Sequence, residues 1–240
     1  EIATPNIDRL AAGGLRYNNF HTTALCSPSR AALLTGRNHH TVGVRAITNM
    51  VTGEENAKGK VTKKAAMLSE VLRDNGYNTF ALGKWHLAPT YETTAAGPYD
   101  NWPLGRGFDR FYGFLDAETD QYFPALTYDN HRVEPPRRAG YHLSEDLVDK
   151  SVEFIGNQQM ALPDKPFFLY LAFGAAHAPH QAPKEFIDRY KGVFDKGWDA
   201  IRVDRLERMK KLGIVPANTD LAPRNDGVKA WETLSAEEKR

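Results

Sequence analysis

The sequence predicts an α/β fold with a largely parallel central sheet flanked by helices. Short apolar segments of strand length alternate along the chain with amphipathic helical segments, an order typical of parallel sheets. The segment "PFFLYLAF" at residues 166–173 is apolar at nearly every position, as expected of a strand that is covered on both faces. The composition, 41% hydrophobic and 25% charged residues, is that of an ordinary globular protein.

Helix signals occur along the whole chain. Each is a capping residue followed by apolar residues at helical spacing, and the four start signals are Thr4, Ser27, Thr62 and Ser144. Proline directly follows the first two, at a position that favours it, and glycine ends both of these helices. A charged helical region is predicted from residue 192 onward.

Strands are predicted between these helices, over residues 15–23, 77–82 and 166–173. The stretch from residue 83 to residue 141 is rich in glycine, proline and aromatic residues. This composition predicts a long excursion over the surface rather than new core.

Chemically reactive residues follow the predicted strands, at the carboxyl ends where open α/β sheets bind their ligands. The three segments are "TALCSPSR", "GKWHL" and "GAAHAPH". They offer one thiol, two cations, three imidazoles and no carboxylate: Cys26, Arg30, Lys84, His86, His177 and His180. A set of cations and imidazoles without a carboxylate favours an anionic substrate. The free N–H groups of a helix N-terminus would also face Cys26 and favour an anion there.

Each of these residues also has a purely structural interpretation. A lone cysteine beside an apolar segment is usually inert packing, Lys and Arg are usually solvated, and two histidines alone indicate a metal site only weakly. A cysteine phosphatase loop is excluded, because it needs arginine six positions after the cysteine and residue 32 is alanine. Three such segments at three strand ends favour a functional site over coincidence.

The segment "CSPSRAALLTGR", residues 26–37, resembles the signature of the type I, formylglycine-dependent sulfatases, C-x-P-S-R-x-x-x-L-T-G-R, and matches every fixed position. "GYNTFALGKWHL" and "GRGFDRFYGF" resemble the same family, which belongs to the alkaline phosphatase superfamily, and residues 195–225 resemble its bacterial arylsulfatase branch. The resemblance implies that residues 1–240 are part of an N-terminal sulfatase catalytic domain with no second domain. We expect the chain to be an internal fragment, truncated at both ends.

The resemblance implies that a formylglycine-generating enzyme converts Cys26 to formylglycine, whose hydrate attacks the sulfur of a sulfate ester, most often an aryl sulfate. Arg30 would orient and stabilise the formylglycine, Lys84 would bridge it and the sulfate, and His86 would assist the hydrate. His177 would contact the sulfate and protonate the leaving alcohol. Lys84 and His177 would therefore also bind the substrate.

The resemblance also implies a divalent cation, usually Ca²⁺, held by Cys26 as formylglycine, by an Asp-Asp pair and by an Asp-Asn pair. No Asp-Asp pair occurs in the sequence, and "NDG" at residues 225–227 is interpreted as a turn. The acidic ligands are therefore expected outside residues 1–240, and this chain alone is expected to bind the metal weakly. His180 matches no family role and is interpreted as structural.

Two other functions stay open: a phosphonate or phosphate ester hydrolase of the same superfamily, and an inactive anion-binding fragment. The net charge of +1 gives no case for nucleic acid or a membrane surface, and no apolar run approaches the ~20 residues that span a bilayer. The natural sulfate ester stays open, with residues 45–60 and 87–120 as candidate substrate loops. The oligomeric state and the choice between bacterial cytoplasm and periplasm are open as well.

Overall fold

The computed structural model describes residues 2–239, which divide into two compact units. One unit combines residues 2–21 with residues 184–239, and the other consists of residues 22–183. The sheet and the five residues expected in the site all lie in the second unit. The expectation of a single partial domain over the whole chain stays a prediction.

The sheet has five strands in the order β4-β3-β2-β1-β5. Their bounds are β1 Asn78–Lys84, β2 Arg110–Phe114, β3 Leu126–Tyr128, β4 His131–Val133 and β5 Phe167–Ala172. β1 pairs in parallel with β2 and with β5, whereas β3 and β4 extend the sheet as antiparallel strands. The predicted α/β fold is confirmed, with β2, β1 and β5 as its parallel part.

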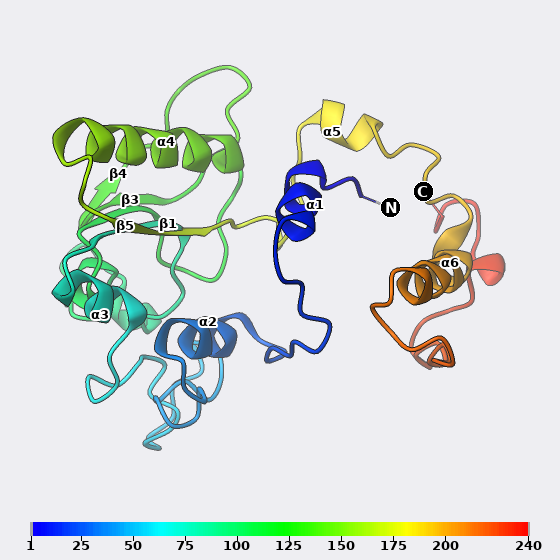
Figure 1. Ribbon diagram of the computed structural model, residues 1–240, viewed down its shortest axis with the longest axis horizontal. Helices are drawn as coiled ribbons and strands as arrows, with labels where there is room; N and C mark the ends of the chain where they lie inside the picture. The colour runs from blue at the N-terminus through cyan, green and yellow to red at the C-terminus, as the bar shows by residue number, and fades with distance from the viewer. Residues whose placement is uncertain (1, 240) are drawn as a thin grey trace. The chain divides into compact units, whose positions relative to one another are not determined.

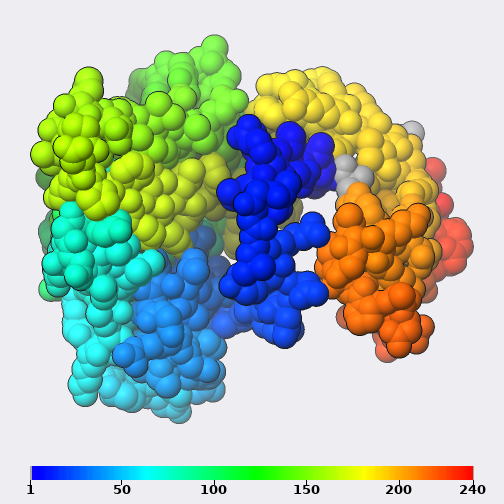
Figure 2. Space-filling model, viewed as in Figure 1, coloured from blue at the N-terminus to red at the C-terminus, as the bar shows by residue number. Residues whose placement is uncertain are grey.

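Helices cover both faces of this sheet (Figure 1). α4, Leu143–Ala161, packs on one face against Phe80 and Leu82 of β1. α2, Cys26–Thr35, lies on the opposite side, where its residues share a core with Ala81 of β1. α3, Leu68–Asp74, lies on that side as well, and Figure 2 shows its surface in cyan and that of α4 in yellow-green. Successive β1 residues thus enter different cores, as the two-residue period of a strand requires.

The stretch from residue 83 to residue 141 was expected on the surface, and this expectation is wrong. It contributes β2, β3 and β4, together with short 3₁₀ turns at Thr90–Glu92 and Leu104–Arg106. It also supplies much of the buried aromatic core: Trp85, Trp102, Phe108, Phe111 and Phe114. These strands have three to five residues, so they are too short for a strand pattern to stand out in the sequence.

β5 corresponds to the apolar segment that was expected to be covered on both faces. Instead β5 is an edge strand that pairs only with β1 among the described strands, and all its residues are half-buried. β1 lies between two neighbours, and every residue of it after Asn78 is buried. The most buried strand is therefore β1.

One predicted strand is absent and several predicted helix starts differ. Residues 15–23 form no strand, since no described strand pairs with them. α2 begins at Cys26 with Leu25 at the N-cap position, so Ser27 lies inside the helix, while Gly36 ends it with φ of +64° as expected. The third helix begins six residues after Thr62, and His142 rather than Ser144 caps α4 by accepting a hydrogen bond from the Ser144 N–H.

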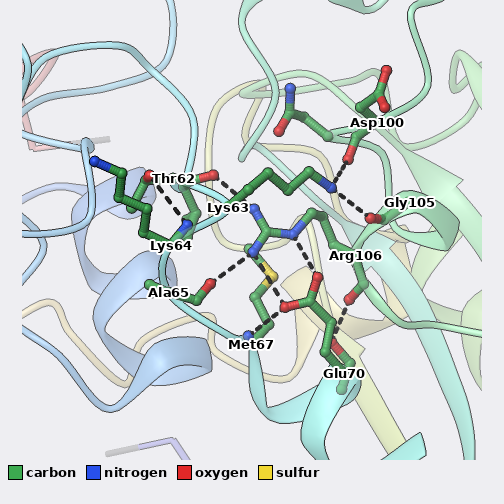
Figure 3. A network of polar contacts seen from close by, with 12 residues as sticks. Thr62, Lys63, Lys64, Ala65, Met67, Glu70, Asp100, Gly105 and Arg106 are labelled. Carbon is green, nitrogen blue, oxygen red and sulfur yellow. Dashed lines mark hydrogen bonds and ion pairs between the residues drawn. The ribbon is translucent and has the colours of Figure 1, made fainter. Parts of the chain in front are cut away.

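Arg106 fixes the segment that leads into α3 (Figure 3). Its guanidinium is fully buried and donates hydrogen bonds to the carbonyls of Val61 and Ala65 at 2.7 and 3.1 Å. It also pairs with the carboxylate of Glu70, which in turn accepts a hydrogen bond from the N–H of Met67 at the helix start. A buried charge needs such partners, because an unpaired one would destabilise the fold.

The regular elements described in the unit of residues 2–21 and 184–239 are all helical: α1 Pro5–Ala12, α5 Lys184–Asp188, α6 Gly197–Lys211 and a 3₁₀ turn at Trp231–Thr233. The rings of Trp198 and Trp231 meet edge to face, 4.9 Å apart. Gly197 has φ of +80°, and a side chain there would collide with the Trp231 ring. Among residues 2–239, no helix combines the length and the apolar character that crossing a membrane requires.

Candidate active site at the carboxyl end of the central strand

The candidate site is built where β1 ends and α2 begins. Cys26 is the first residue of α2, and Lys84 is the last residue of β1. His86 follows two residues later, and His177 comes five residues after the end of β5. The parallel register places the ends of β1 and β5 side by side, so the two segments that follow them share one edge of the sheet, as predicted. Cys26 was predicted to follow a third strand, but residues 15–23 form none, and Cys26 joins this edge through its contact with His86.

Gly83 sets the direction in which the chain leaves β1. Its φ is +93°, a backbone conformation that favours glycine. A side chain at this position would collide with the carbonyl of Ala172 on the neighbouring strand β5. The close approach of β1 and β5 immediately before Lys84 therefore requires glycine.

Cys26 and His86 are in direct contact. Sγ of Cys26 lies 3.1 Å from Nδ1 of His86, across 60 residues of sequence. His86 is 2% exposed and has φ of +51°, which is uncommon for a residue other than glycine. The backbone N–H of His86 donates to the carbonyl of Leu115, beyond the end of β2, at 3.0 Å. The backbone thus holds this imidazole against Cys26.

His86 is neutral at physiological pH. Burial above all, together with the positive charges of Lys84, Arg30 and His177, lowers its pKa to about 3. A neutral imidazole accepts a hydrogen bond at one ring nitrogen and donates from the other. Because the His86 ring is neutral, one of its nitrogens is free to accept a proton from the group at residue 26.

Arg30 connects α2 with the ends of β1 and β5. One of its terminal nitrogens donates to the backbone carbonyl of Lys84 at 2.7 Å and to the hydroxyl of Tyr170 at 3.1 Å. These bonds orient the guanidinium one helical turn along from Cys26, as its four-residue spacing predicted.

Lys84 is 3% exposed, although its side chain ends in an ammonium group. Burial lowers the pKa of Lys84, the positive charge of Arg30 adds to this effect, and Cys26 and the carboxylate of Glu118 partly offset it. A buried ammonium without a strong ion pair is costly, so this arrangement favours an anion beside it.

Three polar atoms close to Cys26 are buried and find no hydrogen-bond partner among residues 2–239: Oγ of Ser27, Nε of Arg30 and Nε2 of His86. Most buried polar atoms in native proteins are paired. Two of these three atoms are nitrogens that can donate to an anion. The vicinity of Cys26 therefore has the donors of an anion-binding site.

His177 lies in a more open environment, with 43% of its side chain exposed. Its Nδ1 is 3.0 Å from the carbonyl of Ala178 and 3.4 Å from a carboxylate oxygen of Glu118. The charge of His177 still influences His86, so the two imidazoles belong to one electrostatic environment. His180 is exposed, and its structural interpretation stays a prediction.

Glu118 is the site residue that the sequence analysis missed, since it expected no carboxylate here. Glu118 lies four residues beyond β2, inside the stretch that was expected to be a surface excursion. Recognising the strand at residues 110–114 is the signal that could have found it, because the end of that strand meets the same sheet edge.

The described residues do not provide a metal site. Among residues 2–239, no three His, Cys, Asp or Glu side chains form a group that could hold an ion. Arg30 and Lys84, next to Cys26, are cations that would repel one. Ca²⁺ needs six to eight oxygen ligands, so the ligand set seen here does not fit this ion by itself.

The chain belongs to the sulfatase family, whose model matches residues 1–228. An uncharacterized sulfatase of Schizosaccharomyces pombe is 33% identical, with 100% of this chain and 45% of that protein aligned. An arylsulfatase of Klebsiella aerogenes is 31% identical, with 100% of this chain and 52% of that protein aligned. Human N-acetylgalactosamine-6-sulfatase is 32% identical over 83% of this chain and 39% of its own length.

The chain spans about half the length of the first two of these relatives. Among solved structures, Ps i-CgsB is 30% identical over 79% of this chain and 45% of that chain, with a TM-score of 0.56. The structure of BT4656 in complex with its substrate D-glucosamine-2-N,6-O-disulfate is 25% identical over 80% of this chain and 33% of that chain, with a TM-score of 0.59. The fold is thus that of the sulfatases in the alkaline phosphatase superfamily.

Proposed function

We propose that the protein hydrolyses sulfate esters and that Cys26, as formylglycine, supplies the nucleophile. The proposal depends chiefly on the 3.1 Å contact between Sγ of Cys26 and Nδ1 of the neutral His86, in a setting of buried cations. An unmodified cysteine with such neighbours would be an ordinary thiol nucleophile, but the sequence around it lacks the arginine position of cysteine phosphatases.

The residue 26 site fits a formylglycine hydrate. When present, this group supplies a hydroxyl nucleophile and an aldehyde that can be restored after sulfate has left. His86 lies within hydrogen-bond distance of residue 26 and is neutral, so it can accept the hydroxyl proton. Burial of His86 away from water keeps this acceptor oriented.

The two cations act on the sulfate. Arg30 is fixed by its bonds to the Lys84 carbonyl and to Tyr170, with Nε buried and unpartnered, so it can donate to a sulfuryl oxygen without reorganising. Lys84 is buried beside it and adds a second positive charge where negative charge develops. His177, the more exposed imidazole, is the proton donor to the leaving alcohol.

Aryl sulfates are the proposed first substrates, in line with the arylsulfatase from Klebsiella aerogenes among the relatives. Sulfated sugars are the second class, since the neighbour BT4656 has D-glucosamine-2-N,6-O-disulfate as its substrate. A divalent cation such as Ca²⁺ stays a prediction for the protein, and no step above depends on it.

The test is a parallel assay of 4-nitrophenyl sulfate and a 4-nitrophenyl phosphonate ester with the protein as its native host makes it. The proposal expects the larger kcat/KM for the sulfate. A larger kcat/KM for the phosphonate would replace the sulfatase proposal with the phosphonate hydrolase alternative. Binding of sulfate with no turnover of either ester would support the inactive anion-binding alternative.

A further inference from the structure

Two loops meet beside His177, one after β2 and one after β5. The first is residues 116–123, which contains Glu118, and the second is residues 174–183, which contains His177. The only carboxylate within ion-pair distance of His177, among the described residues, comes from the other loop. The mechanism proposed above gives Glu118 no role.

The side chain of Gln181 also joins the two loops. The amide of Gln181 donates from Nε2 to the carboxylate of Asp120 and accepts from the N–H of Gln121, each at 2.7 Å. Gln121 is 2% exposed, and its carbonyl accepts the N–H of Leu143, the first residue of α4, at 2.8 Å. We name this set of contacts the Gln181 clamp. The clamp lies two residues from Glu118 and four residues from His177, so both are carried on fixed backbone.

The contacts of His177 specify which ring nitrogen carries its proton. Nδ1 lies near the carbonyl of Ala178 and near the carboxylate of Glu118, and both groups can only accept. Nδ1 therefore carries a hydrogen, and Nε2 is left for a ligand. An imidazole held in this way presents one defined nitrogen to a substrate.

We propose that Glu118 is a positioning residue for His177 and that the Gln181 clamp keeps it in place. The proposal rests on the proposed function, in which His177 protonates the leaving alcohol. As the bond from sulfur to the alcohol oxygen breaks, its electron pair stays on that oxygen, and the sulfur binds the nucleophile at residue 26. The oxygen then takes the proton from Nε2 of His177. Glu118 stays ionised and keeps its contact with the Nδ1–H.

Dependence on the leaving group tests this role. An alcohol such as 4-nitrophenol leaves readily without a proton, whereas phenol needs one. We expect Glu118→Gln to lower kcat/KM for phenyl sulfate about tenfold and for 4-nitrophenyl sulfate less than about twofold. Glu118→Asp, which keeps a carboxylate, should lose less on phenyl sulfate than Glu118→Gln. Gln181→Leu should show the same preference as Glu118→Gln.

Asp116→Asn is the matched control, because Asp116 is an exposed carboxylate on the same loop. It removes the same charge two residues away and should leave both rates unchanged. An equal loss on both esters in Glu118→Gln, or the phenyl-selective loss in Asp116→Asn, would overturn the positioning role.

A second measurement does not require activity. Correlation of the histidine ring ¹⁵N and ¹H signals by NMR, with His177→Gln to assign them, reports the tautomer of His177. We expect the Nδ1–H form in the wild type and a larger share of the Nε2–H form in Glu118→Gln. An unchanged tautomer in Glu118→Gln would overturn the inference even if the esterase activity is present. An inactive wild type that shows the expected tautomer change would contradict the proposed function alone.

Discussion

His86 and His177 follow neighbouring strands, β1 and β5, yet their environments are opposite. His86 is buried, touches Cys26 and has no carboxylate partner among the described residues, and its pKa is lowered to about 3. His177 is nearly half exposed and pairs with Glu118. The same side chain is therefore buried and kept neutral at one position, and open to water beside a carboxylate at the other.

The difference comes from strand position. β1 is central and fully covered, so a residue just beyond it is desolvated, and the cations Lys84 and Arg30 disfavour a further positive charge there. Among the strands of residues 2–239, β5 lies at the edge of the sheet, its residues are half-buried, and His177 in the loop after it is 43% exposed. In the proposed mechanism, this difference in burial assigns proton acceptance to His86 and proton donation to His177.

The largest expected effect on activity follows from substitution of Cys26, the residue that His86 contacts. Cys26→Ala should lower turnover of 4-nitrophenyl sulfate by at least about 10³-fold, because it removes the nucleophile itself. The circular dichroism spectrum should not change, since Cys26 is half-buried and alanine is a good helix former at the start of α2. Near-normal activity of Cys26→Ala would contradict the formylglycine mechanism.

The buried histidine should destabilise the protein in acid. Its folded-state pKa of about 3 lies below the ordinary value of 6.5, so between these pH values only the unfolded chain binds the extra proton. Stability therefore falls as the pH drops below about 6.5.

From about pH 7.5 to about pH 4.5, the wild type should lose about 2 kcal/mol more of its free energy of unfolding than His86→Gln. Urea denaturation at the two pH values measures this difference. His177→Gln is the control, and it should lose as much as the wild type. Equal losses in the wild type and His86→Gln would mean that His86 is not held neutral.

Trp85 anchors the backbone between Lys84 and His86. Its indole N–H donates to the carbonyl of Asn101 at 2.7 Å within the core, and its ring meets Phe108 edge to face. Trp85→Phe should lower the free energy of unfolding by about 1–3 kcal/mol, because it leaves the Asn101 carbonyl buried and unpaired.

Trp198→Phe is the matched control for this substitution. The indole of Trp198 donates to the Lys229 carbonyl at an exposed position, where water can replace it. The loss should stay below about 0.5 kcal/mol. Thermal or urea denaturation that ranks the two variants in the opposite order would contradict the anchoring role of Trp85.

The smallest expected effect is at the exposed histidine. Glu118→Gln should change the free energy of unfolding by less than about 0.5 kcal/mol, because exposed ion pairs are screened by water. Both partners are largely exposed, at 57% for Glu118 and 43% for His177. A loss above about 1 kcal/mol in urea denaturation would mean that Glu118 is a structural residue rather than a positioning residue for His177.

The sequence was sufficient to predict the parts that depend on local patterns. Helical spacing and the terminal glycine predicted α2, although its N-cap is Leu25 and not the predicted Ser27. The position of "GKWHL" after a strand predicted that His86 would lie near Cys26. The pKa of His86 could not be predicted, because it depends on burial by segments distant in the sequence.

Glu118 was missed for a related reason. β2 and β3 have five and three residues and lie in a stretch rich in glycine and proline, so the residues between them were predicted to be surface loop. The edge position of β5 could not be predicted either, because the order of strands in a sheet is set by tertiary pairing and not by the composition of one strand.

The mass of the tryptic peptide that contains Cys26, residues 17–30, tests the central claim most directly. Formylglycine in place of cysteine lowers the peptide mass by about 18 Da. For the protein purified from its native host, we predict the lower mass for most of the peptide. A peptide that carries only the unmodified thiol would contradict the assignment of Cys26 as the source of the nucleophile.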